Sequence, residues 1–213
     1  MTTVVVVRPG WTEFDEQHRV VGSLDLLLNS RGEEQVLLLI SRLREFSPEV
    51  VLGGTGQPAK ATAAAIGEVL GIKARESKDF NNLNQGLWQG LSIQEIRRKM
   101  PRIFKQWQEA PETICPPEGE PWEEAVKRIQ KALKKPLRKY ASLALVASEP
   151  LASLVCSVLT GEPPDLSAAF PEAPGDPIID VLESTGSDGH FERKSEPPPK
   201  RSIESPTPAP AGR

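Results

Sequence analysis

The sequence predicts an α/β fold in which a mostly parallel central sheet lies between two layers of helices. Two observations support this prediction. Short runs of β-branched and aliphatic residues, such as 4–7, are typical of strands that are buried on both faces of a parallel sheet. These runs alternate with longer segments whose apolar residues recur at helical spacing, such as 32–45. Such alternation indicates parallel strands joined by helical connections.

The first half of the chain is expected to supply three strands and two helices. The strands are expected over residues 2–7, 50–54 and 72–74. The helices are expected over residues 32–45 and 59–70, and Gly71 is a suitable residue to end the second one. Residues 77–90 are polar and are expected to form a loop.

The second half is expected to supply three helices and three strands. The helices are predicted over residues 92–105, 121–139 and 151–159, the last one ending at Gly161. We place Pro121 at the first helical position, followed by acidic residues that the helix dipole favours. The strands are predicted over residues 143–147, 178–183 and 190–194, with a turn at 186–189 before the last one.

The chain is predicted to form one domain, residues 1–195, followed by a disordered tail, residues 196–213. The tail has six prolines in 18 residues and one large apolar residue, Ile203. Burial of so little apolar surface does not offset the entropy of ordering the chain. The segment 197–201 could also bind a protein partner as a polyproline helix.

Composition excludes several functional classes. The 26 basic and 29 acidic residues give a net charge of −3, which argues against a dedicated nucleic-acid or membrane-surface protein. Basic runs at 97–105 and 127–139 are interpreted as solvated helix faces. No apolar stretch is long enough to span a membrane, and the N-terminus does not resemble a signal peptide. Two cysteines predict neither a disulfide framework nor a metal site. We therefore expect a cytoplasmic protein without a metal or cofactor.

The residues that follow the first expected strand are regularly spaced. They are Arg8, Gly10, Thr12, Arg19, Gly22, Asp25, Leu28, Gly32 and Gln35. This spacing resembles the opening motif of the histidine phosphatase superfamily, the phosphoglycerate-mutase-like proteins, with Asp15 at the position of the family's asparagine. Later motifs also match, at Ala59, Thr62, Ala63, Ile66, Gly86, Trp88, Gly90, Pro117, Gly119, Glu120 and 145–147. The resemblance covers residues 3–194 and implies the family's three-layer α/β fold.

The resemblance also implies that the reactive positions are altered. Pro9 stands at the place of the nucleophilic histidine, and the amide nitrogen of a proline has no usable lone pair for attack on phosphorus. The second histidine aligns with Ser148, the second phosphate-binding arginine with Pro58 and the general acid with Asn82. Glu149 adds a negative charge where a phosphate would approach. These departures predict a catalytically inactive protein with a binding or regulatory role.

Part of the family's anion site is retained. By resemblance, the remnant consists of Arg8, Gly10, Thr12 and Arg19, and its expected ligand is a phosphorylated small molecule or another anion. A plain salt-bridge role for Arg8 remains open. Trp11 could fill the mouth of the pocket. A regulatory role would also require a protein partner, which the sequence does not identify.

Two alternative functions remain open. The first is an active phosphomonoesterase or phosphomutase that uses His18, Ser148 or Glu149 in place of the family's residues. We favour a surface or capping role for His18, and helix capping rather than catalysis for Glu120. The second alternative is a structural interaction protein that acts through the proline-rich tail.

Overall fold

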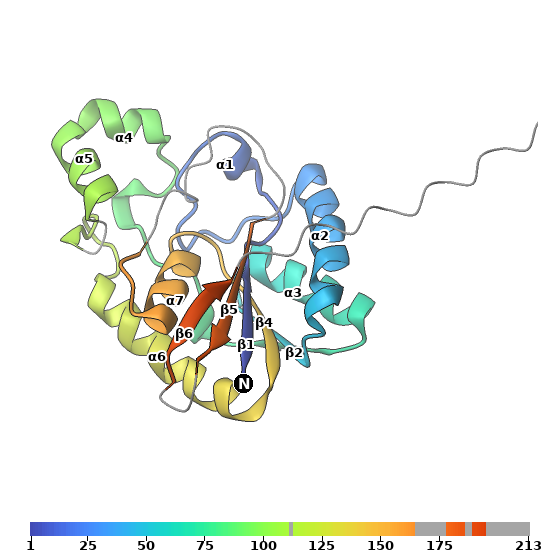
Figure 1. Cartoon of the computed structure of the whole chain (residues 1–213). Coiled ribbons are helices and arrows are strands. Elements are labelled where there is room, and N and C mark those ends of the chain that lie inside the picture. Colours follow the sequence, from blue (N-terminus) through green and yellow to red (C-terminus); the bar gives the residue numbers. More distant parts are fainter. Residues whose placement is uncertain (111–112, 165–177, 186–188, 195–213) are drawn as a thin grey trace, which may run out of the picture.

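The structure is a computed structural model, and it describes residues 1–110, 113–164, 178–185 and 189–194. Its centre is a six-stranded sheet with the strand order β3-β2-β4-β1-β5-β6 (Figure 1). The strands are β1 (Thr3–Val7), β2 (Val50–Gly53), β3 (Lys73–Glu76), β4 (Ser142–Val146), β5 (Ile179–Ser184) and β6 (Phe191–Lys194). The first four of these strands are mutually parallel, and β5 and β6 form an antiparallel extension beside β1. The mostly parallel sheet is confirmed.

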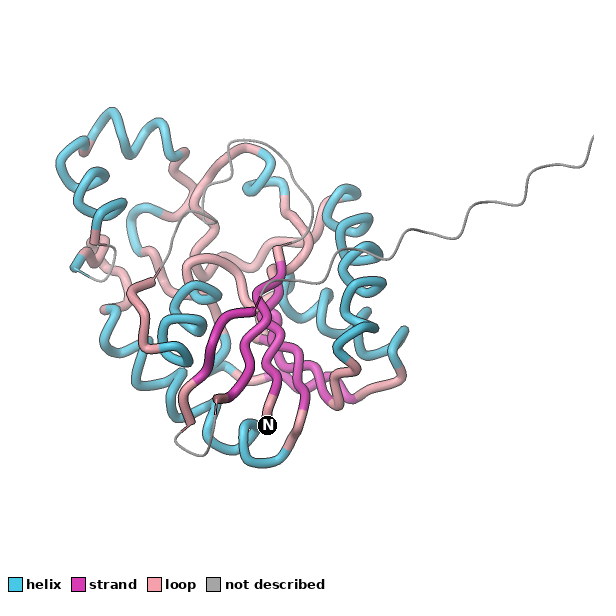
Figure 2. The backbone as a smooth tube through the Cα atoms, in the orientation of Figure 1, coloured by secondary structure: helices cyan, strands magenta, loops and turns pink. Residues whose placement is uncertain are grey.

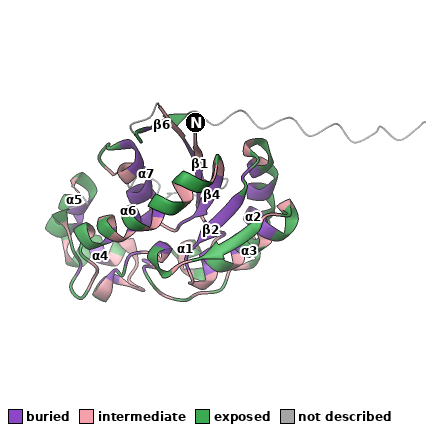
Figure 3. Ribbon diagram, turned by 90° about the horizontal axis from the view of Figure 1, so that it is seen from below, coloured by how far each residue is buried: buried purple, intermediate pink, exposed green. Residues whose placement is uncertain are grey.

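Helices cover both faces of the sheet, so the three-layer prediction is also confirmed. One face packs against α2 (Ser30–Leu43) and α3 (Gln57–Leu70), and the other against α6 (Trp122–Lys139) and α7 (Leu151–Thr160). Strand β1 shows why both faces need covering. Val4 and Val6 belong to the core under α6 and α7, whereas Val5 and Val7 belong to the core under α2 and α3. Figure 3 shows these inner surfaces buried.

A third apolar cluster lies beside the sheet under α4 (Ile93–Lys99) and α5 (Pro101–Glu109). Its centre is a T-shaped pair of Trp88 and Trp107 with ring centroids 5.3 Å apart. The single helix expected over residues 92–105 is therefore wrong. Met100 leaves the helical conformation because the following Pro101 disfavours it there, so the segment forms two helices.

Four smaller features differ from the expectations or refine them. A short helix, α1 (Glu13–Glu16), interrupts the loop after β1. Pro121 is the N-cap of α6 rather than its first helical residue. The loop 77–90 contains two 3-10 turns, η2 (Lys78–Phe80) and η3 (Gly86–Trp88), and a third turn, η1 (Arg44–Phe46), extends α2. The predicted tail, 196–213, lies outside the described residues.

Loops gather at the end of the sheet where β1, β2 and β4 finish (Figure 2). Parallel strands present their carboxyl ends at one edge, which is where ligands bind in open α/β sheets. Among the described helices, none is both long enough and apolar enough to cross a membrane.

Candidate active site

A small open pocket lies at the carboxyl ends of the parallel strands. The loop after β1 contributes residues 21–24, the segment after β2 contributes Gly54, Gly56, Pro58 and Ala59, and the remaining lining residues are Phe80, Asn81, Asn82 and Ser148. The structure thus brings together Pro58, Asn82 and Ser148, three of the positions that the resemblance assigns to reactive groups. Pro9 and Arg8 are not among the residues that line the pocket.

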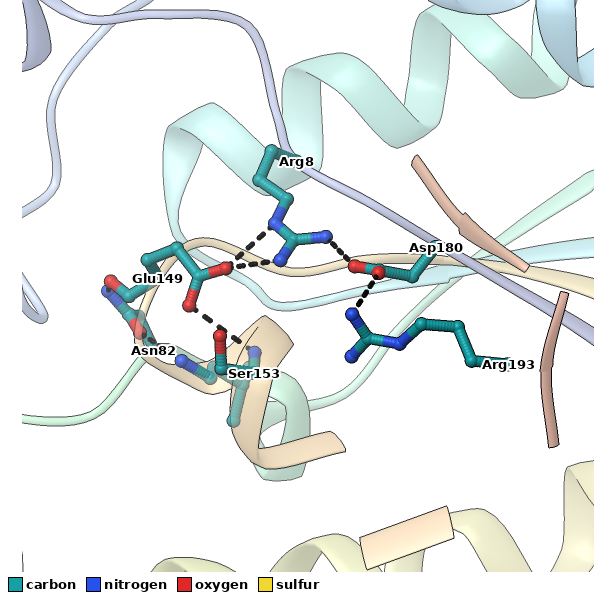
Figure 4. Close-up of polar contacts among 7 residues, drawn as sticks. Arg8, Asn82, Glu149, Ser153, Asp180 and Arg193 are labelled. Atoms are coloured by element: carbon teal, nitrogen blue, oxygen red, sulfur yellow. Dashed lines mark hydrogen bonds and ion pairs between the residues drawn. The ribbon is translucent and has the colours of Figure 1, made fainter. Parts of the chain in front are cut away.

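Arg8 lies at the end of β1, between two carboxylates from distant parts of the chain (Figure 4). Its Nε donates a 2.8 Å hydrogen bond to Glu149 Oε1, and a terminal nitrogen of the guanidinium donates to the same oxygen. The other terminal nitrogen donates to Asp180. Arg193 completes the group with a 3.1 Å ion pair to Asp180. The side chains of Arg8, Glu149 and Asp180 are 13%, 9% and 11% exposed.

The electrostatics of this cluster favour its charged state. Burial by itself would lower the pKa of Arg8, but the charges of Glu149 and Asp180 outweigh burial, and the pKa lies above its ordinary value. Arg8 therefore stays protonated. The pKa of the neighbouring Cys156 thiol is also raised, to about 12, because burial and the charge of Asp180 disfavour the thiolate. Cys156 is accordingly neutral at physiological pH.

Asn82 ties three loops together at the pocket wall. Its Nδ2 donates to the carbonyl oxygens of Gly22 and Glu149 at 3.0 and 2.8 Å. Its Oδ1 accepts a 3.3 Å bond from the backbone N–H of Leu151. The amide thus holds the loop after β1 and the segment between β4 and α7 around the pocket. The sequence indicated Asn82 only as a substituted general acid and did not reveal this positioning role.

The other three residues of the predicted anion site have structural contacts. The backbone N–H of Gly10 donates to Thr62 Oγ1 at 3.1 Å, and a Cβ on Gly10 would lie 2.3 Å from the carbonyl oxygen of Gly32. Thr12 caps α1 through a capping box with Asp15. Arg19 donates to the carbonyl oxygen of Gly90 at 2.7 Å. Of the four predicted residues, Arg8 alone pairs with Glu149, which adjoins the pocket residue Ser148.

Trp11 and His18 lie away from the pocket lining. The guanidinium carbon of Arg31 lies 5.1 Å from the centroid of the Trp11 ring, so the ring packs against the first turn of α2. Trp11 is not among the lining residues of this pocket. His18 is exposed and adopts a left-handed conformation with φ of 52° just after α1. This position agrees with a surface role.

The capping role expected for Glu120 is wrong. Its two carboxylate oxygens accept 2.6 and 2.9 Å bonds from Arg128, which also donates to the carbonyl oxygen of Asp79 at 2.5 Å. The pair joins the start of α6 to η2. No side-chain hydrogen bond caps α6, whose N-cap is Pro121.

Sequence reasoning did not identify Asp180 and Arg193. The available signal was weak: Asp180 is a charged residue within an otherwise apolar strand pattern, and the sequence does not show which cation it meets. Within the described residues, no group of three or more histidine, cysteine and acidic side chains is arranged to hold a metal ion.

The sequence is similar to known phosphatases over most of its length. Phosphoserine phosphatase 1 of Hydrogenobacter thermophilus is 24% identical over 162 residues, which are 75% of this chain and 77% of that protein. The uncharacterized phosphatase PhoE of Bacillus subtilis is 31% identical over 101 residues, 47% of this chain and 52% of that one. The fold matches mycobacterial glucosyl-3-phosphoglycerate phosphatase in complex with VO3, with a TM-score of 0.79 and 22% identity over 91% of this chain and 98% of that one.

These relatives overturn the prediction of a catalytically inactive protein. Several are named phosphatases, and none of the similarities points to an inactive branch. The prediction rested on side-chain identity at a few aligned positions. The structure has a pocket at the strand ends, and the retained Arg8 is bonded to Glu149, the neighbour of the lining residue Ser148. Residues 4–190 match the model of the histidine phosphatase superfamily (branch 1), and the chain belongs to this family.

Proposed function

We propose that this protein hydrolyses phosphate monoesters of small molecules. The observation that carries the proposal is the placement of Arg8 at the end of β1, bonded to Glu149, the neighbour of the pocket residue Ser148. Its support comes from family membership and from relatives named for phosphoserine and glucosyl-3-phosphoglycerate. The proposed substrates therefore belong to the same class, small organic molecules that carry one phosphate ester.

Arg8 is the proposed phosphate-binding group. A guanidinium presents several N–H donors in a planar fork that matches the oxygens of a phosphate, and it keeps its charge at every physiological pH. Phosphoryl transfer depends mostly on positioning and on compensation of negative charge. In our proposal Arg8 supplies the charge, while Asn82 positions the pocket wall through its bonds to Gly22, Glu149 and Leu151.

The proposed reaction proceeds without a phosphohistidine, because Pro9 offers no nucleophilic nitrogen. Water is the final acceptor: its oxygen forms a bond to phosphorus, the ester P–O bond breaks, and the alcohol leaves with a proton. Ser148 lines the pocket and carries a hydroxyl that offers a second route. In that route the serine oxygen bonds to phosphorus as the ester P–O bond breaks, the hydroxyl proton goes to the leaving alcohol, and water then hydrolyses the phosphoserine. Mass spectrometry of protein quenched during turnover distinguishes the two routes, because transfer through Ser148 leaves a phosphoserine.

The test is release of inorganic phosphate from phosphoserine, 3-phosphoglycerate and p-nitrophenyl phosphate. We expect turnover by the unaltered protein and a loss of about 100-fold or more in Arg8→Lys, since loss of one preorganised donor costs about this much. Arg128→Lys is the matched control, because Arg128 is also a partly buried arginine paired with a glutamate. Turnover no higher than a protein-free blank, or equal turnover in Arg8→Lys, would contradict the proposal. A phosphomutase would isomerise a phosphorylated substrate without releasing phosphate.

A further inference from the structure

We propose that Glu149 is a built-in competitor of the substrate, a carboxylate that occupies the edge of Arg8 where a phosphate would bind and that must be displaced first. The inference rests on the proposed function in taking Arg8 as the phosphate-binding group. It adds a specificity-determining residue to that site.

The donor edges of Arg8 are occupied by two carboxylates. Carboxylates and phosphates bind the same donor edges of a guanidinium, so one excludes the other. Glu149 Oε1 accepts bonds from both Nε and a terminal nitrogen, which together form one such edge. Asp180 accepts from the remaining terminal nitrogen. All three nitrogens of Arg8 are therefore bonded to carboxylates.

The two carboxylates contact the guanidinium of Arg8 from opposite sides (Figure 4). Glu149 follows Ser148, a lining residue, and its carbonyl oxygen is bonded to Asn82, another lining residue. Asp180 lies on the opposite side of the guanidinium, toward Arg193 (Figure 4). In this proposal a ligand in the pocket approaches Arg8 on the side of Glu149, which lies across the guanidinium from Asp180 (Figure 4).

The carboxylate of Glu149 is also held by a second contact, away from Arg8. Glu149 Oε2 accepts a 3.3 Å bond from the backbone N–H of Ser153 in the first turn of α7, where the helix dipole favours negative charge. The side chain is 9% exposed. An incoming phosphate must displace Glu149 from its bonds to Arg8 and Ser153, and it is also repelled by the negative charge of this carboxylate. Substrates with further binding groups are therefore favoured over inorganic phosphate.

The experiment titrates the full-length protein with inorganic phosphate by isothermal calorimetry. Glu149→Gln keeps the size of the side chain and removes its charge, and we expect it to bind phosphate about tenfold more tightly, equivalent to about 1.4 kcal/mol. Glu120→Gln is the matched control, because Glu120 is also a partly buried glutamate paired with an arginine but is far from the pocket lining in sequence and not part of it. We expect its phosphate affinity to equal that of the unaltered protein.

Three outcomes would overturn the proposal: unchanged or weaker binding by Glu149→Gln, an equal gain in Glu120→Gln, or a gain that persists when Arg8→Ala is added to Glu149→Gln. Thermal unfolding checks that each variant is folded. If Glu149→Gln does not fold, Glu149→Asp takes its place: the shorter side chain withdraws the carboxylate from Arg8, and we expect several-fold tighter binding. Unchanged affinity in that variant would equally overturn the proposal.

The titration is independent of turnover, so the two proposals fail separately. Tighter binding in Glu149→Gln supports the competitor role even if the unaltered protein releases no phosphate from any ester. Conversely, turnover by the unaltered protein together with unchanged affinity in Glu149→Gln overturns the competitor role and leaves the phosphatase function intact.

Discussion

Two partly buried arginines of this molecule, Arg8 and Arg128, are both paired with a glutamate, but in different surroundings. Arg128 meets Glu120 only eight residues away in sequence, with one bond to each carboxylate oxygen. Its third contact is a backbone carbonyl oxygen, that of Asp79. The result is a local clamp with side chains that are 19% exposed. Every donor edge is used to join α6 to η2.

Arg8 instead collects its partners over long sequence separations. Glu149 and Asp180 are 141 and 172 residues away, on the segment after β4 and on β5. Arg8 faces two carboxylates where Arg128 faces one, and one of its partners, Glu149, follows the pocket residue Ser148 in sequence. The difference teaches that the same pair of residue types can join neighbouring elements in one place and connect distant parts of the chain in another, where we propose that an anion exchanges with the carboxylate. What decides is whether a ligand can reach the arginine.

The largest expected effect is on the thiol next to the Arg8 cluster. Cys156 is 1% exposed with a pKa raised to about 12, whereas Cys115 is exposed. At pH 8 the thiolate fraction of Cys156 is lower than that of an ordinary thiol by roughly 10³-fold. We expect Ellman's reagent to modify one thiol rapidly and the second only on unfolding. Comparable rates for both thiols would contradict the buried position of Cys156.

The same thiol gives a pH dependence whose sign is fixed. An unfolded cysteine releases its proton near pH 8.5, roughly its ordinary pKa, whereas folded Cys156 retains the proton up to a pKa of about 12. The contribution to stability is present below the lower pKa and is lost as the pH rises toward the higher one. Urea titrations between these pH values should show a falling free energy of unfolding, and Cys156→Ala should show a smaller slope.

The next effect separates the two arginines directly. Arg8→Ala leaves Glu149 and Asp180 buried with one fewer cation between them, and breaking a buried pair in this way costs about 3–5 kcal/mol. Arg128→Ala leaves one carboxylate, that of Glu120, without its cation, and this carboxylate lies nearer to solvent. We therefore expect a smaller loss in the free energy of unfolding. Urea denaturation measures both values. Equal losses in the two variants would show that Glu149 and Asp180 depend on Arg8 no more than Glu120 depends on Arg128.

The sequence predicted the layers well because they depend on local patterns. The valines of β1 predict a strand buried on both faces, and the helical spacing in α2 and the glycine after α3 predict where helices lie and end. Two errors had signals in the sequence: Pro101 predicts the break between α4 and α5, and Thr12 with Asp15 predicts the capping box of α1.

The site was less predictable because its contacts are long-range. The motif register drew attention to Arg8, and the pocket lining includes Asn82 and Ser148 as the resemblance suggested. The pairing with Asp180 depends on β5 lying antiparallel beside β1 in one register, which no local pattern encodes. The same limit explains the error about activity, since aligned side chains do not show which charges the fold brings together.

A moderate effect is expected from the carboxylate on the far side of Arg8. Asp180→Asn keeps an acceptor oxygen but weakens the charged bond to Arg8, which contributes about 1.5–3 kcal/mol. It also weakens the partly solvated pair with Arg193, which contributes about 0–1 kcal/mol. The same change removes a charge that raises the pKa of Cys156. We therefore expect lower stability together with faster modification of Cys156 above pH 8. Slower modification of Cys156 would contradict the inference that the charge of Asp180 raises the pKa of this thiol.

The smallest effect is expected at the outer end of the cluster. Arg193 is 44% exposed, and its 3.1 Å ion pair with Asp180 is partly solvated, so Arg193→Ala should lower the free energy of unfolding by only about 0–1 kcal/mol. Asp180 keeps Arg8 as a partner in that variant. Urea titrations at low and high salt provide the measurement, with Lys194→Ala on the same strand as the control. A loss as large as that of Arg8→Ala would show that the whole chain of charges acts as one unit, because removal of its exposed end would then unpair the buried part.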